Sequence, residues 1–177
     1  SQIMNFQTMI HSADDYWYVN QYENWREGRG FTIDPQYDDL KVRRTPVYPI
    51  IYGFFAYEFG KELGLTFLKY FQILLFCISA LLIYLIVINV SANSSLAFFT
   101  GVVYAVCPFI ISYLPFTITE AVSPFFVTLS IYSYLKARTK QSWSWFFWTG
   151  IICSMAALNR PLILMIILSL IGVESYF

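Results

Sequence analysis

Two neighbouring carboxylates near the start of the chain, Asp14 and Asp15, have the residue type and setting that could support catalysis. They precede the aromatic stretch WYVNQYENW in a polar part of the sequence. A carboxylate that stays ionised can accept the proton of an attacking hydroxyl. The same pair would also suit the first turn of a helix, where the helix dipole stabilises negative charge. On position alone, both interpretations stay open.

Arginines supply the second kind of chemistry. Arg43 and Arg44 precede a proline-rich turn, and Arg160 interrupts an apolar run between Asn159 and Pro161. The guanidinium fork matches the oxygens of a phosphate, so these side chains could bind an anionic lipid headgroup. Arg43 and Arg44 would serve equally well as ordinary interfacial anchors.

One carboxylate, Glu120, also lies in an apolar surrounding. Ionisable side chains at membrane depth are costly, so they mark either a functional site or a structural pair. Glu120 and Arg160 could therefore belong to a site, or they could form a single ion pair between two helices.

The distribution of charge predicts the elements that must position these residues. Only 12% of the residues are charged, about half the fraction of a soluble domain. Fifteen of the 22 charged residues lie in residues 1–62, whereas residues 71–135 hold Glu120 alone. Apolar runs of about 18 residues or more predict membrane-spanning helices. We therefore expect an all-α integral membrane protein, a polytopic helix bundle preceded by a polar loop.

The loop is expected to comprise residues 1–65, with interfacial amphipathic helices near 11–30 and 50–59. The motif RTPVYP between these helices predicts a rigid extended turn, because proline restricts itself and the residue before it. The transmembrane region is expected to comprise residues 66–177. Its predicted spans are residues 70–90, 96–114 with a kink at Pro108, 117–135, and 143–173 with a break at 159–161. The sequence leaves open whether the last span is one kinked helix or two short ones.

Basic residues in the short loop predicted at 136–142 set the orientation. Lys136, Arg138 and Lys140 mark this loop as cytoplasmic. Counting back through three spans makes residues 1–65 extracytoplasmic, and it brings Glu120 and Arg160 to the same side. The sequence thus predicts a polar site on the outer face of the membrane.

Other functions are disfavoured by the composition. The net charge is zero, which gives no electrostatic support for nucleic-acid binding. One histidine and three scattered cysteines provide no metal-ligand spacing, so we expect no metal site from the sequence. The chain starts without Met and ends directly after an apolar run, and we therefore expect it to be part of a longer protein.

The order of five motifs resembles a known family. ADDYWYV, GRGF, RTPVYPIIYGF, TITEAVSPFF and LNRPLILMI follow one another as in the N-terminal part of GT-C glycosyltransferases. The nearest branch is that of protein O-mannosyltransferases and lipid A aminoarabinose transferases. The resemblance implies a multi-pass enzyme of a bacterial inner (plasma) membrane. Such an enzyme moves a sugar, with inversion, from a polyprenyl-phosphate donor to a lipid, protein or glycan acceptor.

The resemblance also implies roles for the residues above. Asp14, with Asp15 adjacent, would be the base that activates the acceptor hydroxyl. Arg43, Arg44 and Tyr48 would lie near the donor at the proline turn.

The later helices would complete the site. Arg160 would contact the donor phosphate, and Glu120 would support the site or orient the acceptor. A divalent metal is compatible with the family but not required by the sequence. Two alternatives remain: a non-catalytic membrane subunit or scaffold, and a lipid transporter.

Overall fold

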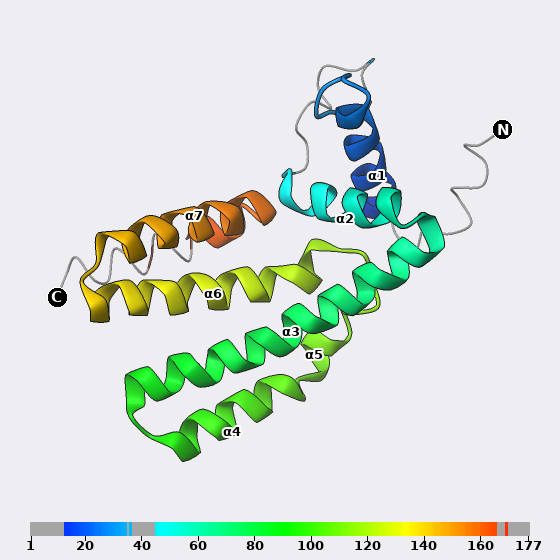
Figure 1. Ribbon diagram of the computed structural model, residues 1–177. Coiled ribbons are helices and arrows are strands. Elements are labelled where there is room, and N and C mark those ends of the chain that lie inside the picture. The colour runs from blue at the N-terminus through cyan, green and yellow to red at the C-terminus, as the bar shows by residue number, and fades with distance from the viewer. Residues whose placement is uncertain (1–12, 35, 37–44, 166–168, 170–177) are drawn as a thin grey trace. The chain divides into compact units, whose positions relative to one another are not determined.

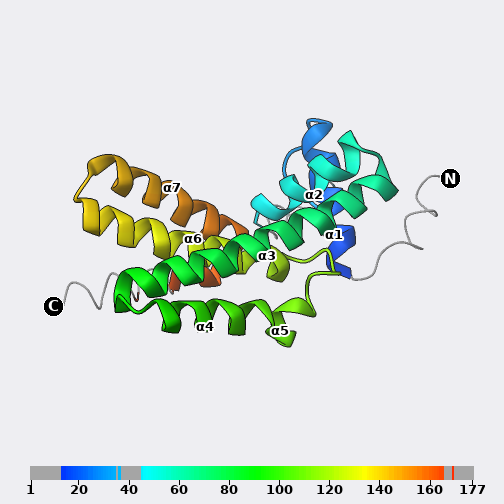
Figure 2. The ribbon, with the colours of Figure 1, turned by 60° about the horizontal axis from the view of Figure 1, so that its bottom comes forward.

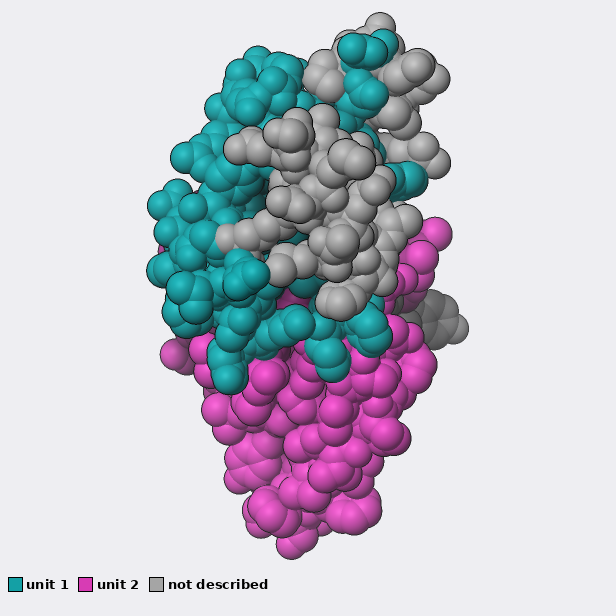
Figure 3. Space-filling model, turned by 90° about the vertical axis from the view of Figure 1, so that its right-hand side faces the viewer, with its two compact units in different colours: residues 1–70, 115–118 teal, residues 71–114, 119–177 magenta. Residues whose placement is uncertain are grey.

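The computed structural model describes residues 13–34, 36, 45–165 and 169. This part of the chain folds into seven α-helices and contains no strand, which confirms the all-α membrane class predicted from the sequence. The chain divides into two compact units (Figure 3). The first comprises residues 1–70 with 115–118, and the second comprises residues 71–114 with 119–177.

The first unit is built on helices α1 (Ala13–Arg26) and α2 (Val47–Glu58), which pack against each other (Figure 1). The Tyr18 ring meets Tyr48 edge-on, with 4.9 Å between ring centroids. Tyr18 is 2% exposed and Tyr22 is 9% exposed, whereas Trp25 is 49% exposed. The sequence suggested that this aromatic face suits the membrane–water interface. Its two tyrosines form the contact with α2, and the interfacial location stays a prediction.

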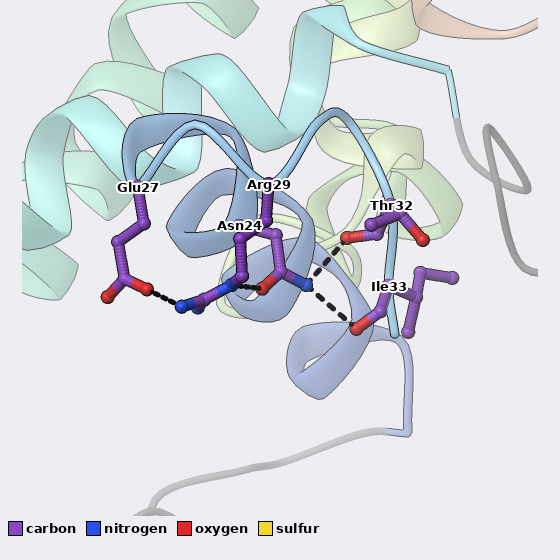
Figure 4. A network of polar contacts seen from close by, with 5 residues as sticks. All are labelled: Asn24, Glu27, Arg29, Thr32 and Ile33. Atoms are coloured by element: carbon purple, nitrogen blue, oxygen red, sulfur yellow. Dashed lines mark hydrogen bonds and ion pairs between the residues drawn. The ribbon is translucent and has the colours of Figure 1, made fainter. Parts of the chain in front are cut away.

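A side-chain network closes the end of α1 (Figure 4). The Asn24 amide donates to the carbonyls of Thr32 and Ile33 at 2.9 and 3.1 Å. Arg29 Nε donates to Asn24 Oδ1 at 2.8 Å, and the Arg29 guanidinium also pairs with Glu27. The chain can reverse here because glycines at 28 and 30 take left-handed φ values of 75° and 88°. The network therefore ties the returning loop to the last turns of α1.

The proline turn is helical, which corrects the prediction of an extended segment. Helix α2 begins at Val47, directly after Pro46, and Tyr48 and Pro49 lie in its first turn. Proline is tolerated there because the first N–H groups of a helix have no intrahelical acceptor. The two prolines thus start the helix that the sequence placed only from residue 50.

Helix α3 (Lys61–Ser91) follows α2 after Gly60, whose φ is 75°. It contains the span predicted at 70–90, but it starts nine residues earlier than that prediction. Close to its start, a Cβ added at Gly64 would lie 2.1 Å from the carbonyl oxygen of Phe55. The backbones of α2 and α3 therefore approach each other closely at this glycine.

Helices α4 (Ser94–Ala105) and α5 (Pro108–Ile111) return beside α3 (Figures 1 and 2). Phe76 stacks on Tyr104 across this hairpin, with 5.4 Å between ring centroids. The helix stops at Ala105 and restarts with Pro108, so the kink predicted at Pro108 is an interruption of the helix. Two helical stretches of the described chain, Glu62–Ser91 and Ser94–Ile111, are long and apolar enough to cross a membrane.

Helices α6 (Thr119–Lys140) and α7 (Trp143–Asn159) form a second antiparallel hairpin (Figures 1 and 2). The loop predicted at 136–142 is wrong in its extent, because α6 continues to Lys140 and the chain turns at Gln141, where φ is 47°. Lysine, alanine and arginine favour helix, and basic side chains are stabilised near a helix C-terminus. That the segments 117–135 and 143–173 cross the membrane stays a prediction.

Most of the buried side chains of α6 and α7 are small or hydroxylated. Such residues allow two helices to approach closely where lipid surrounds them. The buried residues of this kind are Ala121, Ser123, Thr128, Ser130, Ser133, Ala137, Thr149 and Ala156.

Helix α7 ends where the sequence predicted a break. Arg160 is extended, with φ −151° and ψ 112°, and helical backbone resumes at residues 162–165. The residue before a proline is disfavoured from the helical region, so Pro161 explains the interruption. Within the described residues, helical backbone therefore lies on both sides of this break.

Candidate functional site

The residues assigned from the first motifs are only partly visible. Asp14 and Asp15 lie in the first turn of α1, as the helix-dipole interpretation requires, but the positions of their side chains are not described. Arg43 and Arg44 lie outside the described residues. Their catalytic and donor-binding roles therefore stay predictions.

Tyr48 has a clear structural role. It is fully buried between α1 and α2, where its ring contacts Tyr18. The ring thus contributes to helix packing within the first unit. Contact between Tyr48 and a donor stays a prediction, and the buried side chain offers no exposed surface for it.

Glu120 and Arg160 come together at one end of the α6–α7 hairpin. Arg160 Nη1 lies 3.0 Å from Glu120 Oε1, and the Thr119 hydroxyl donates to Glu120 Oε2 at 3.0 Å. The Arg160 side chain is 42% exposed and that of Glu120 is 34% exposed. The interhelical ion pair considered from the sequence is therefore formed. It is also open enough for a further ligand to reach the guanidinium.

A buried polar contact lies directly beside this ion pair. Asn159 Nδ2 donates to the Ser123 hydroxyl at 2.9 Å, and that hydroxyl donates to the Thr119 carbonyl at 2.7 Å. Asn159 is 1% exposed and Ser123 is 8% exposed. Sequence reasoning treated Asn159 only as part of a helix break. Asn159 ends an apolar run of the sequence, and an amide in such a place needs a hydrogen-bond partner. This position was the signal that could have indicated its contact with another helix.

The first unit holds a second polar group that the sequence did not reveal. Burial raises the pKa of Tyr57 well above its ordinary value, and a hydrogen bond to the Glu23 carboxylate raises it further. The Arg26 guanidinium carbon lies 4.7 Å from the centroid of the Tyr57 ring. Tyr57 of α2 thus contacts an acid and a base of α1, Glu23 and Arg26.

Metal ligands are not grouped in the part of the chain that the structure describes. Within those residues, no three His, Cys, Asp or Glu side chains are placed to hold a metal ion.

The fold and the ion pair define an all-helical membrane protein with an acid and an arginine at the end of one helical hairpin. The chain belongs to the dolichyl-phosphate-mannose-protein mannosyltransferase family, whose family model matches residues 43–177. The resemblance to GT-C glycosyltransferases is thereby confirmed. No curated protein and no solved structure matches the chain.

The matched segment divides the assigned residues. Tyr48, Glu120 and Arg160 lie inside it, whereas Asp14 and Asp15 precede it. Membership makes the protein a membrane glycosyltransferase of the mannosyltransferase type. The base assignment therefore depends on the motif at 13–19 and not on the family match.

Proposed function

We propose that the protein moves a sugar from a polyprenyl-phosphate donor to an acceptor hydroxyl on the extracytoplasmic face of the membrane, with inversion. The observation that carries this proposal is the half-exposed ion pair of Arg160 with Glu120, inside the segment that matches the family. A guanidinium near the membrane surface suits the phosphate of a lipid-linked donor.

The reaction is a single displacement at the anomeric carbon. Asp14 accepts the proton of the acceptor hydroxyl, and the hydroxyl oxygen forms a bond to the anomeric carbon. The bond from that carbon to the phosphate oxygen breaks, and polyprenyl phosphate leaves with the bonding electrons. Attack opposite the leaving group inverts the configuration.

Arg160 is suited to stabilise the leaving phosphate. Among the described residues, its guanidinium contacts Glu120 through Nη1, so Nε and Nη2 remain available for phosphate oxygens. Glu120 would then hold the guanidinium in place while the other N–H groups bind the donor. Charge that develops on the phosphate as the bond breaks is stabilised by such a fixed cation.

The position of the basic residues supports the proposed side of the membrane. Lys136, Arg138 and Lys140 lie at the opposite end of α6 from Glu120. A helix of 22 residues is about 33 Å long, which is close to the thickness of the hydrocarbon core. If the basic end is cytoplasmic, the ion pair lies at the outer face.

The proposal is tested by transfer from a panel of labelled polyprenyl-phosphate sugars, with the complete protein in membranes. Asp14→Asn should abolish transfer without reducing expression, and Glu58→Gln, at an exposed carboxylate that the proposal does not use, serves as the control. Arg160→Ala should raise the donor KM. Normal turnover in Asp14→Asn would refute the assigned base, and transfer from none of the donors by the unaltered protein would favour a non-catalytic subunit.

A further inference from the structure

The bond between Asn159 and Ser123 lies one residue from the candidate donor-binding arginine. It joins the last residue of α7 to the first turns of α6, and both side chains are buried. Two helices in lipid gain stability from such a neutral polar bond without carrying charge into the apolar interior.

The direction of each hydrogen bond in this contact is fixed by chemistry. A serine hydroxyl has one proton, and the Ser123 proton is directed to the Thr119 carbonyl, 2.7 Å away. The same oxygen can then only accept from Asn159 Nδ2, at 2.9 Å. Asn159 is therefore held by an acceptor that is itself anchored to the backbone of α6.

Arg160 has little helical support of its own. Its N–H still donates to the Ala156 carbonyl at 3.0 Å, but its φ and ψ are extended because Pro161 follows. With this extended backbone at a helix end, the arginine side chain could otherwise point in many directions. The nearest fixed point along the chain is the buried side chain of Asn159.

The two contacts follow the register of the antiparallel hairpin. Ser123 and Glu120 are three residues apart on α6, which places them on neighbouring parts of one helix face. Asn159 contacts the buried Ser123, and Arg160 contacts the partly exposed Glu120. The buried bond and the half-exposed ion pair are thus consecutive links between the same two helices.

We propose that Asn159 is a positioning residue for Arg160. Its bond to Ser123 holds the end of α7 against α6, so that the Arg160 guanidinium is presented to Glu120 and to the donor phosphate. The part of this proposal that concerns the donor rests on the proposed function. The part that concerns the ion pair does not, because it is a statement about how two helices are joined.

The ion-pair part is tested by unfolding of the complete protein in detergent. The coupling between Glu120→Gln and Arg160→Gln is measured in the unaltered background and again with Ser123→Ala. We expect at least half of the coupling to disappear in the altered background, and Asn159→Ala should act in the same direction. An unchanged coupling overturns the proposal.

Ser130→Ala is the matched control. Ser130 is buried on the same helix, and its hydroxyl also donates to the carbonyl four residues earlier, that of Phe126 at 2.7 Å. This bond stays within α6, so the substitution should leave the coupling intact. A loss of coupling in Ser130→Ala as well would show a general effect of weakened packing and would also overturn the proposal.

The donor part is tested by steady-state kinetics. Ser123→Ala and Asn159→Ala should raise the donor KM about tenfold, the effect of losing one buried hydrogen bond, and change kcat less. In an Arg160→Ala background neither should raise the KM further. If Arg160→Ala raises the KM and Asn159→Ala does not, the positioning role is refuted. If Arg160→Ala has no effect, the proposed function loses its phosphate contact, and the unfolding experiment decides the positioning role.

Discussion

The ring of Tyr22 fills the space that a side chain at Gly53 would need. A Cβ added at Gly53 would lie 2.0 Å from Cγ of Tyr22, and both ring Cδ atoms are within 2.3 Å of that point. The absence of a side chain at this position allows the ring to lie flat against the backbone of α2. This approach brings Tyr22 to Tyr57, with 5.4 Å between ring centroids, and so joins the helix that carries Asp14 to the proline-initiated helix.

Gly53→Ala is expected to lower the thermal unfolding temperature of the protein in detergent. The added methyl group would displace Tyr22, and overpacking of a filled contact costs about 1–3 kcal/mol. Gly150→Ala is the matched control, since Gly150 is also inside a helix but has nothing within 4 Å of its added Cβ. That substitution should raise the unfolding temperature slightly, because alanine favours helix over glycine by about 1 kcal/mol. Equal effects of the two substitutions would contradict the close contact.

Tyr57 is expected to make stability depend on alkaline pH. Burial, and then the hydrogen bond to Glu23, raise the pKa of the folded-state phenol above its ordinary value of about 10. The folded protein therefore holds this proton more tightly than the unfolded chain does. The resulting stability is fully present below pH ~10 and is lost as the pH rises above it.

The measurement is the free energy of unfolding as a function of pH, together with the ultraviolet absorbance of tyrosinate. Tyr57→Phe should remove this part of the alkaline destabilisation. Glu23→Gln should retain the effect of burial and lower the Tyr57 pKa only part of the way. An alkaline profile that is the same in Tyr57→Phe and in the unaltered protein would refute the assignment.

Asn24→Ala is expected to loosen the loop after α1. The substitution removes the donor to the carbonyls of Thr32 and Ile33, and a buried carbonyl without its partner costs about 1–3 kcal/mol. Hydrogen exchange should become faster at the backbone amides of residues 27–34. Exchange within α6 and α7 provides the internal control and should not change. Faster exchange throughout the chain would mean global unfolding instead of a local effect.

The parts of the fold that the sequence predicted correctly depend on local signals. Pro108 and Pro161 interrupt their helices because proline lacks a backbone N–H and restricts the residue before it. The pairing of Glu120 with Arg160 was among the predictions because an isolated charge in an apolar run needs a partner. In each case a single residue type carries most of the information.

The parts that it missed depend on contacts between elements. Nothing in the order of residues distinguishes a tyrosine face that meets α2 from one that meets lipid, and Tyr18 and Tyr22 meet α2. The hydroxyl of Ser123 bonds its own helix as well as Asn159, so it looks like many other serines in apolar helices. Its role follows from the register of α6 against α7, which is a tertiary property.

Exchanging the charges of Glu120 and Arg160 separates a structural role of the pair from a role in donor binding. Glu120→Arg alone should lower stability, since it places two guanidinium groups where a pair at 3.0 Å existed. Adding Arg160→Glu should restore most of that stability, although the pair itself contributes only about 1 kcal/mol or less because both side chains are partly exposed.

The donor KM should stay high in the exchanged protein, because the guanidinium is then on α6 and a carboxylate occupies its former position beside the phosphate. Thermal unfolding and donor KM are measured on the same preparations of both variants. Recovery of both quantities would show that the donor does not depend on the position of the cation, and recovery of neither would show that the pair does not hold the two helices together.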